Sequence, residues 1–239
     1  MKKIVALTGA GISAESGLRT FRDAGGLWEG HDVMEVASPQ GWAADRALVL
    51  EFYNQRRKQA REALPNEGHR ALAALEKDFE VVVVTQNVDN LHEQAGSSRV
   101  LHLHGELFKS RSTLDPSLVY NMDGWELKEG DLCEKGSQLR PHIVWFGEMV
   151  PMMEVAMQEA MSADIFLVIG TSMLVYPAAG LINFVASEVP KYIIDPNKPE
   201  GVGGDNIYFY EEPASTGVPA VAAYLREDLA STQDYGTAP

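Results

Sequence analysis

The most constraining stretch of the chain lies at its amino terminus, where an apolar run leads directly into a glycine-rich turn. Residues 3–8 read KIVALT and residues 9–17 read GAGISAESG. A buried strand followed by such a turn and a helix start aims backbone N–H groups at one point, which suits a phosphate. Gly9, Gly11 and Ala14 match the loose G-x-G-x-x-G/A pattern, in which the glycines allow close approach to a ligand and Ala14 lets the helix pack against the strand. An ordinary strand-to-helix turn would need the same small residues, so both interpretations stay open at this point.

Further apolar runs of strand length predict the rest of the fold. They are nearly continuous rather than alternating, which is typical of a mostly parallel sheet covered by helices on both faces, and hence of the α/β class. The predicted strands are Ile4–Leu7, Phe79–Val84, Val100–Leu103, Ile165–Ile169, Tyr192–Ile194 and Ile207–Tyr210. The predicted helices are Arg46–Leu64, which Asp45 is placed to cap, then Ala71–Glu76, Val155–Met161, Ala178–Ala186 and Val218–Leu229.

Polar residues follow several of these strands where the strands end. Thr8 precedes the glycine loop, residues 85–87 (TQN) follow the second run, residues 170–172 (GTS) follow the fourth, and Asp195 follows the fifth. In an open α/β sheet the ligand crevice lies at the carboxyl ends of the strands. The convergence of these termini predicts a nucleotide site there.

The residues after the glycine loop point to a particular family. An acidic residue that would hold a ribose about twenty positions on, as in a dehydrogenase, does not follow. Instead, residues 9–23 (GAGISAESGLRTFRD) and 25–28 (GGLW) closely resemble the signature of the sirtuins, which are NAD-dependent protein lysine deacylases. The resemblance continues in order at TQNVDNLHEQAG, HLHGEL, VWFGE, GTS and VYPAAG, and so spans nearly the whole chain.

The resemblance also implies a domain organisation. One catalytic domain is expected over residues 1–230, with a Rossmann-like large lobe and a smaller inserted subdomain. The subdomain would consist of a helical insertion at about 31–66 and a degenerate zinc-ribbon-like module at about 109–140. Residues 231–239 are expected to form a flexible tail.

The expected zinc-ribbon module lacks most of its metal ligands. In the family, four cysteine thiolates usually hold the zinc at this position. This chain has a single cysteine, Cys133, and hydroxyl side chains stand where the first pair would fall, namely Ser110, Ser112 and Thr113. We therefore expect no zinc, and a module stabilised by packing alone.

The resemblance assigns chemistry to three residues near the strand ends, with His104, Asn87 and Gln86 as the expected catalytic set. His104 matches the family's base, and a histidine titrates near the pH at which a ribose hydroxyl must lose its proton. Gln86 and Asn87 are expected at the ribose, and Asp89 would accept a hydrogen bond from the nicotinamide carboxamide. His102 is interpreted as a supporting histidine. Without the family, a packed histidine and a polar turn would be the plainer interpretation.

NAD is the expected co-substrate. The residues expected to bind it are Gly9, Ala10, Gly11, Ser13, Ala14, Thr20, Phe21, Arg22, Trp28, Gln86, Asn87, Asp89, Gly170, Thr171, Ser172, Asp195, Pro196, Asn197 and Ala214. Arg22 can make charge-assisted bonds to phosphate. Asp195 stands where the family often has asparagine; its carboxylate can accept from ribose hydroxyls and would repel the 2′-phosphate of NADP.

A motif on the predicted helix Arg46–Leu64 indicates which acyl group the protein removes from lysine. Tyr53 and Arg56 lie at i and i+3 on the predicted helix and share a face. The segment FYNQRR resembles FYNARR of the sirtuin branch that removes succinyl, malonyl and glutaryl groups, and a phenol beside a guanidinium suits a terminal carboxylate. Arg57, Lys58 and Arg61 follow, so a solvated basic face is the alternative. The segment of Val144, Trp145, Phe146, Gly147 and Glu148 resembles the family's acyl-lysine tunnel, and its remaining expected substrate contacts are Val144, Phe146, Gly147 and Glu148.

The sequence therefore predicts an NAD-dependent protein lysine deacylase that prefers acidic acyl groups, acts more weakly on acetyl-lysine, and yields nicotinamide and O-acyl-ADP-ribose. One alternative is a metal-dependent hydrolase that uses His92, His102 and His104. Another is an NAD-sensing module or an ADP-ribosyltransferase without deacylase turnover.

Composition restricts the classes of partner that the protein is expected to bind. The formal net charge of −14 argues against nucleic acid and acidic membrane surfaces, and suits basic, lysine-bearing protein or peptide segments. No apolar run is long enough to cross a bilayer. One cysteine cannot form an internal disulfide, so we expect a cytoplasmic protein. The oligomeric state stays open.

Overall fold

A computed structural model describes residues 1–239 except 19–26, 29, 199–202 and 235–239, with backbone alone at 27–28 and 232–234. The elements in chain order are β1 (Lys3–Thr8), α1 (Ala10–Ala14), β2 (Leu27–Trp28), β3 (His31–Asp32), α2 (Val33–Val36), α3 (Pro39–Ala44), α4 (Arg46–Glu62), α5 (Glu67–Leu75), β4 (Glu80–Thr85), α6 (Leu91–Ala95), β5 (Val100–His102), β6 (Gly105–Ser112), β7 (Val119–Asn121), β8 (Leu139–Ile143), α7 (Met153–Met161), β9 (Ile165–Ile169), the 3₁₀ helix η1 (Ala178–Phe184), β10 (Lys191–Ile194), β11 (Ile207–Tyr210) and α8 (Ala214–Asp234). None of the helices described is both long and apolar enough to cross a membrane.

The large lobe is built on a six-stranded parallel sheet in the order β11-β10-β9-β1-β4-β5. Strand β1 lies at its centre, where Ile4 pairs with Val81 of β4 on one side and with Ile165 of β9 on the other. The chain fills the sheet outward from β1 in both directions, so a crevice opens at the carboxyl end of β1. The predicted Rossmann-like α/β class is confirmed.

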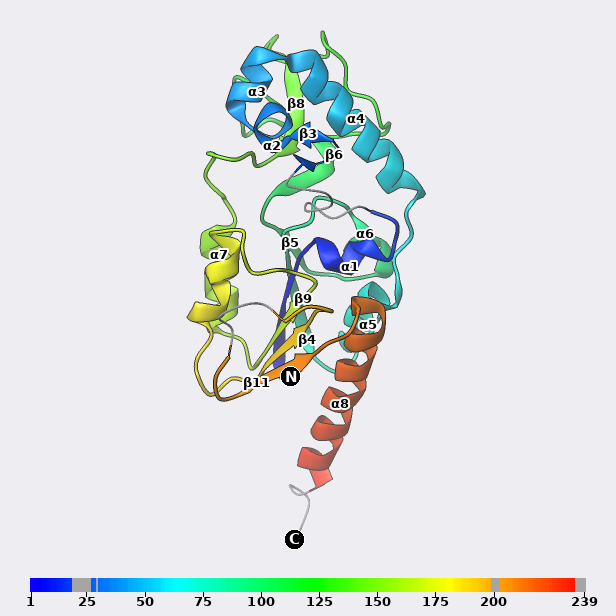
Figure 1. Ribbon diagram of the computed structural model, residues 1–239, viewed down its shortest axis with the longest axis vertical. Coiled ribbons are helices and arrows are strands. Elements are labelled where there is room, and N and C mark those ends of the chain that lie inside the picture. The colour runs from blue at the N-terminus through cyan, green and yellow to red at the C-terminus, as the bar shows by residue number, and fades with distance from the viewer. Residues whose placement is uncertain (19–26, 29, 199–202, 235–239) are drawn as a thin grey trace.

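Each face of the sheet is covered because both sides of its central strand are apolar. Ile4 and Ala6 belong to a core shared with α5 and α8, whereas Val5 and Leu7 belong to a core shared with α7 and η1. Figure 1 shows α5 and α8 on one side of the strands and α7 on the other. This two-sided burial explains why the strands appear in the sequence as continuous apolar runs.

The predicted strands of this sheet are found within a residue of their expected ends. The helices differ more. The region expected as a helix at Ala178–Ala186 is a 3₁₀ helix, and α5 begins earlier than expected because the Asn66 side chain accepts from the Gly68 N–H and caps it. Helix α8 runs on to Asp234, beyond the start of the expected tail.

The small lobe consists of α2, α3, α4 and an antiparallel sheet in the order β7-β6-β8, and lies above the large lobe in Figure 1. Helix α4 was predicted, and the Asp45 carboxylate caps it by accepting from the Leu48 N–H at 2.9 Å. The short helices α2 and α3 were not predicted. The antiparallel sheet was not predicted either, because the module at 109–140 shows little apolar periodicity.

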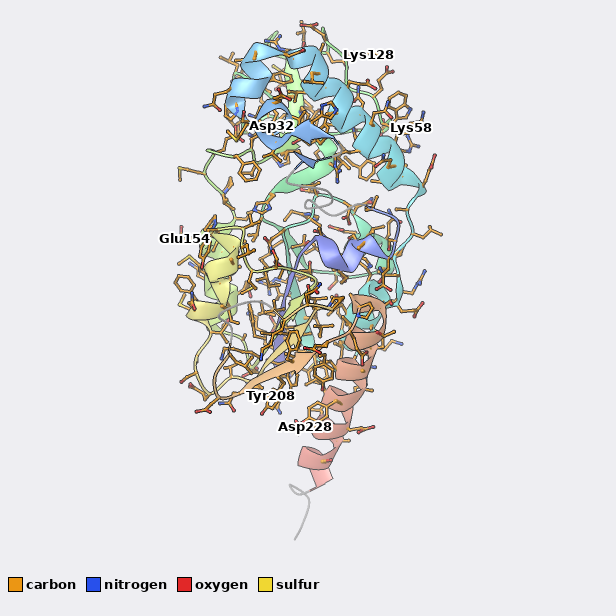
Figure 2. The ribbon with its side chains drawn as sticks, viewed as in Figure 1. Asp32, Lys58, Lys128, Glu154, Tyr208 and Asp228 are labelled. Carbon is orange, nitrogen blue, oxygen red and sulfur yellow. The ribbon has the colours of Figure 1, made fainter. Side chains whose placement is uncertain are left out.

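Buried hydrogen bonds hold this module to helix α4, so the expectation of packing alone is wrong. The guanidinium of Arg57 is fully buried and donates to the carbonyls of Trp125 (2.7 Å) and Leu107 (3.3 Å) and to the Asn54 side chain. Asn54 in turn bonds to both the N–H (2.8 Å) and the carbonyl (3.1 Å) of Leu127. The alternative of a solvated basic face therefore fails for Arg57, although Lys58 does lie at the outer edge of the lobe in Figure 2.

The positions that resemble zinc ligands form a hydrogen-bonded cluster instead. The Ser112 hydroxyl accepts from the Cys133 thiol (3.3 Å) and from the N–H groups of Leu114 and Asp115 (3.1 Å each). One thiol among hydroxyls does not fit the tetrahedral thiolate set that structural zinc requires. Within the described part of the chain, no group of three or more His, Cys, Asp or Glu side chains could hold a metal ion.

Candidate active site

A cleft of about 910 Å³ opens at the carboxyl ends of the sheet strands and reaches the small lobe. It brings together every expected site residue whose side chain is described: Gly9, Ala10, Gly11, Ser13, Ala14, Tyr53, Arg56, Gln86, Asn87, Asp89, His104, Val144, Phe146, Gly147, Glu148, Gly170, Thr171, Ser172, Asp195, Pro196, Asn197 and Ala214. Thr20, Phe21, Arg22 and the Trp28 side chain lie outside the described residues.

The glycines of the first loop are required by the neighbouring strand. The Gly11 N–H donates to the Gly170 carbonyl at 2.8 Å, and a Cβ on Gly11 would lie 2.6 Å from the Gly170 Cα. A Cβ on Gly9 would lie 2.7 Å from the Gly170 oxygen. Ala14 does not pack against the strand as expected; it is exposed at the cleft, and Ile12 packs into the core. The loop therefore rests on the turn after β9.

A buried polar network lies beside this loop. The Asn87 side chain donates to the Gly9 carbonyl (3.0 Å) and to the Ser13 hydroxyl (3.1 Å), and Ser13 donates to the Asp89 carboxylate (3.1 Å). Burial raises the pKa of Asp89, although bonds from Ser13 and from the Leu91 N–H favour its charged form. Asn87 and Asp89 are thus held rigidly at the cleft wall by groups of the glycine loop.

His104 has the tautomer that a general base needs. Its Nδ1 lies 3.1 Å from the Gln86 carbonyl, which can only accept, so Nδ1 carries the proton and Nε2 keeps its lone pair. Burial lowers the pKa of His104, and the bond to Gln86 only partly opposes this. The ring is therefore neutral near pH 7. The Gln86 side chain donates to the Thr171 hydroxyl at 3.1 Å, which ties the two strand ends together.

The other two candidate histidines are engaged elsewhere. His102 donates through Nδ1 to the Asn87 carbonyl (3.1 Å) and through Nε2 to the Glu93 carboxylate (2.7 Å). Burial disfavours its charge, but Glu93 outweighs burial and raises the pKa of His102. Burial lowers the pKa of His92, whose Nε2 lies within hydrogen-bonding distance of the Thr8 hydroxyl, at 3.0 Å. Among the described residues, these histidines do not belong to any group of three or more His, Cys, Asp or Glu side chains that could hold a metal ion, so the arrangement does not favour the metal-dependent hydrolase.

Helix α4 supplies one end of the cleft through Tyr53 and Arg56. Tyr53 is fully buried, and burial raises the pKa of its phenol, which stays protonated although the charge of Arg56 opposes the shift. The Trp145 indole donates to the Tyr53 oxygen at 3.1 Å. The Arg56 guanidinium lies 5.8 Å from the centre of the Phe52 ring. A neutral phenol and a cation thus lie together at this end.

The loop after β8 forms the facing wall, and Glu148 fixes its shape. The Glu148 carboxylate accepts from Arg140 (2.7 Å), Arg111 (3.1 Å) and the Trp145 N–H (2.8 Å). Burial opposes its charge, but these bonds lower the pKa of Glu148. We therefore expect Glu148 to hold the loop rather than to bind substrate. Gly147 has a φ of +86°, and no atom lies within 4 Å of its ideal Cβ position.

Several cleft residues were not foreseen from the sequence. They include Glu15, Leu18, Gln59, Val88, Val150, Tyr176 and Lys198. Gln59 follows Arg56 by one helical turn, so the spacing of α4 could have indicated it. At the far end of the cleft, the Asn197 N–H donates to the Asp195 carboxylate at 2.8 Å, while burial raises the pKa of Asp195.

Comparisons with a family model and with known protein sequences agree with one another. The model of the Sir2 family matches residues 9–177. A protein of Helicobacter pylori named "NAD-dependent protein deacylase" is 55% identical over 216 residues, which covers 90% of this chain and 93% of that relative. A Bacteroides thetaiotaomicron protein of the same name is 53% identical over 223 residues, covering 91% and 95%.

Solved structures agree with the sequence relatives. A mutant Sir2 homologue in complex with ADP ribose superposes with a TM-score of 0.87 at 39% identity, covering 96% of this chain and 94% of the other. A Sir2 homologue in complex with NAD gives a TM-score of 0.86 at 38% identity, covering 95% and 91%. A third Sir2 structure, with a deacetylated peptide and 3′-O-acetyl ADP ribose, gives 0.74 at 28%, covering 94% and 92%.

Proposed function

The chain belongs to the Sir2 family, and from that premise we propose that it is an NAD-dependent protein deacylase that prefers acidic acyl groups on lysine. Succinyl and malonyl are the expected groups, glutaryl is a further candidate, and acetyl would be removed more slowly. The sequence relatives named for deacylase activity support the reaction, and Sir2 structures with NAD or ADP ribose support the co-substrate.

The donors and acceptors of the cleft suit NAD. When bound, NAD supplies a ribose carbon whose bond to nicotinamide can be broken. Asn87 and Asp89 offer an amide and a carboxyl group, and the network through Ser13 keeps them in place. The Nε2 lone pair of His104 can take a proton from a ribose hydroxyl, because Gln86 holds the opposite nitrogen protonated. Preorganised groups of this kind lower a barrier without moving during the reaction.

The preference for acidic acyl groups rests on one observation. Tyr53 and Arg56 line the same end of the cleft, where a buried neutral phenol and a guanidinium both donate hydrogen bonds. A terminal carboxylate accepts such bonds, and charge-assisted ones are about twice as strong as neutral ones. An acetyl group has no atom that could use them. The pair therefore favours succinyl-lysine and malonyl-lysine.

The decisive experiment incubates the protein with NAD and a succinylated peptide, and identifies the products by mass. We expect nicotinamide, the free lysine peptide and O-succinyl-ADP-ribose. Nicotinamide release without peptide deacylation would favour an ADP-ribosyltransferase, and NAD binding without turnover would favour a sensor. Full activity in the presence of a chelator is also expected, whereas inactivation by chelator would favour a metal-dependent hydrolase.

The acyl preference is tested with Arg56→Met. Loss of a charge-assisted contact should lower kcat/KM for the succinylated peptide by roughly 10- to 100-fold. The same peptide carrying acetyl-lysine should change by less than about threefold. Arg61→Met, on the exposed side of the same helix, is the matched control. An equal loss on both peptides would show that Arg56 does not recognise the carboxylate.

A further inference from the structure

Trp145 and Tyr53 form a buried hydrogen bond at the acyl end of the cleft. The indole Nε1 lies 3.1 Å from the phenol oxygen, and the side chains are 2% and 0% exposed. Both residues line the cleft, one from helix α4 and the other from the loop after β8. The bond therefore joins the two walls between which the acyl chain would lie.

The chemistry of this bond fixes the direction of the Tyr53 proton. An indole N–H can only donate, so the phenol oxygen must accept from it. The hydroxyl proton of a phenol prefers the plane of the ring, which leaves it two orientations. The one that points at the indole N–H is excluded, because two protons would face each other. The Tyr53 proton is thus directed away from Trp145, and burial keeps it on the oxygen.

The indole cannot easily leave this position. The guanidinium carbon of Arg140 lies 3.2 Å from the centre of the Trp145 ring, and Arg140 is itself bonded to Glu148 and to the Ile143 carbonyl. Glu148 also accepts from the Trp145 N–H of the backbone, and the Trp42 ring packs at 5.7 Å. The ring is clamped on its face and through its backbone, so its N–H has one orientation.

We propose that Trp145 is a positioning residue for acyl selectivity: its indole N–H orients the Tyr53 hydroxyl so that the phenol, together with Arg56, donates to the terminal carboxylate of an acidic acyl chain. The inference rests on the proposed deacylase function and names a residue that acts without touching the carboxylate. An acetyl-lysine lacks the carboxylate, so its turnover does not depend on the direction of the Tyr53 proton.

The test is a double-mutant cycle of Trp145→Phe and Tyr53→Phe, measured on succinylated and acetylated forms of one peptide. Trp145→Phe keeps an aromatic ring under Arg140 and removes the N–H. We expect it to raise KM for the succinylated peptide about five- to tenfold, which is the effect of one hydrogen bond. The value of kcat, and both constants for the acetylated peptide, should stay within about twofold. In the Tyr53→Phe background, Trp145→Phe should have no further effect.

Two further variants distinguish the loss of the indole N–H from a change in packing. Trp42→Phe alters the packing on the same indole without touching its N–H, and should change neither peptide's constants by more than about twofold. If Trp145→Phe fails to fold, site-specific incorporation of benzothienylalanine at position 145 replaces only the N–H by sulfur, and the same KM change is expected.

The outcomes separate the two proposals. If the wild-type protein deacylates neither peptide, the proposed function fails and the inference fails with it. If the wild type is active but Trp145→Phe lowers both activities equally, or adds its full effect to that of Tyr53→Phe, the deacylase function stands and the positioning role of Trp145 is refuted.

Discussion

Replacing Arg57 by methionine should destabilise the small lobe strongly, although the change removes a buried charge. Arg57 donates to the Trp125 and Leu107 carbonyls and to the Asn54 side chain. Hydrogen bonds to a charged group each stabilise by about 1.5–3 kcal/mol, so the three together contribute roughly 4–9 kcal/mol before any cost. Methionine has a similar length but cannot donate, so all three of these hydrogen bonds are lost.

Burial of the Arg57 charge opposes this stabilisation. Burial lowers the pKa of the Arg57 guanidinium from 12.5 to about 10. At about 1.4 kcal/mol for each pKa unit, the buried charge costs roughly 3 kcal/mol, which methionine would recover. The hydrogen bonds outweigh this cost, so we expect Arg57→Met to lower the free energy of unfolding by about 1–6 kcal/mol. Arg57→Lys should lose at least as much, because one ammonium keeps the charge but cannot reach acceptors on three separate segments.

Urea unfolding followed by circular dichroism measures the effect, with exposed Arg61→Met as the control, for which a change within about 0.5 kcal/mol is expected. Hydrogen exchange at β6 and β8 would locate the loss. If Arg57→Met unfolds at the same urea concentration as Arg61→Met, the hydrogen bonds do not hold the module, and the account of its stability without thiolates is refuted.

Two titrations give further tests. His104→Tyr should abolish deacylation without unfolding the protein. In the wild type, kcat/KM should be constant near neutral pH and should fall as the pH drops through the lowered pKa of His104, below about 6.5. A rate that rises on acidification would show that neutral His104 is not the base. For the His102–Glu93 pair, burial disfavours both charges, yet their bond raises the pKa of His102 and lowers that of Glu93. The pair should therefore stabilise the folded protein most between about pH 4.5 and 6.5, and this contribution should be lost as the pH rises through the raised pKa of His102. The difference in Tm between wild type and Glu93→Gln should therefore shrink from about pH 6 to pH 9. An equal Tm difference at both pH values would contradict the predicted pH dependence.

The large lobe could be predicted because its strands are buried on both faces. Runs such as Val81–Val84 are apolar at every position, and such runs mark interior strands with little ambiguity. The polar residues that follow them also identified the cleft, since the ends of parallel strands meet at one edge of the sheet. The expected site residues thus came from adjacency to strand ends, together with the family resemblance.

The small lobe could not be predicted in the same way. Strand β6 places Lys109 and Arg111 within a half-buried antiparallel pair, so its charges hide the alternation that a strand would show. The role of Arg57 is invisible in the sequence, because its acceptors at Leu107 and Trp125 come from segments far along the chain. A basic triplet such as RRK is usually solvated, and only the tertiary fold buries its middle member completely.

The fold of the small lobe nevertheless bears directly on the proposed chemistry, because two of the segments that link the lobes carry His104 and the expected acyl-lysine contacts. His104 lies immediately before β6, and its carbonyl accepts from the Val144 N–H at 2.9 Å. The next residue, Gly105, has a φ of +84° and pairs with Ile143, and a Cβ there would lie 2.1 Å from the His142 oxygen. The pairing of β6 with β8 therefore sets the position of the His104 ring relative to the loop after β8. Loss of order in this sheet should therefore displace His104 before it disturbs the six-stranded core, so the hydrogen bonds that hold this module also bear on the proposed chemistry.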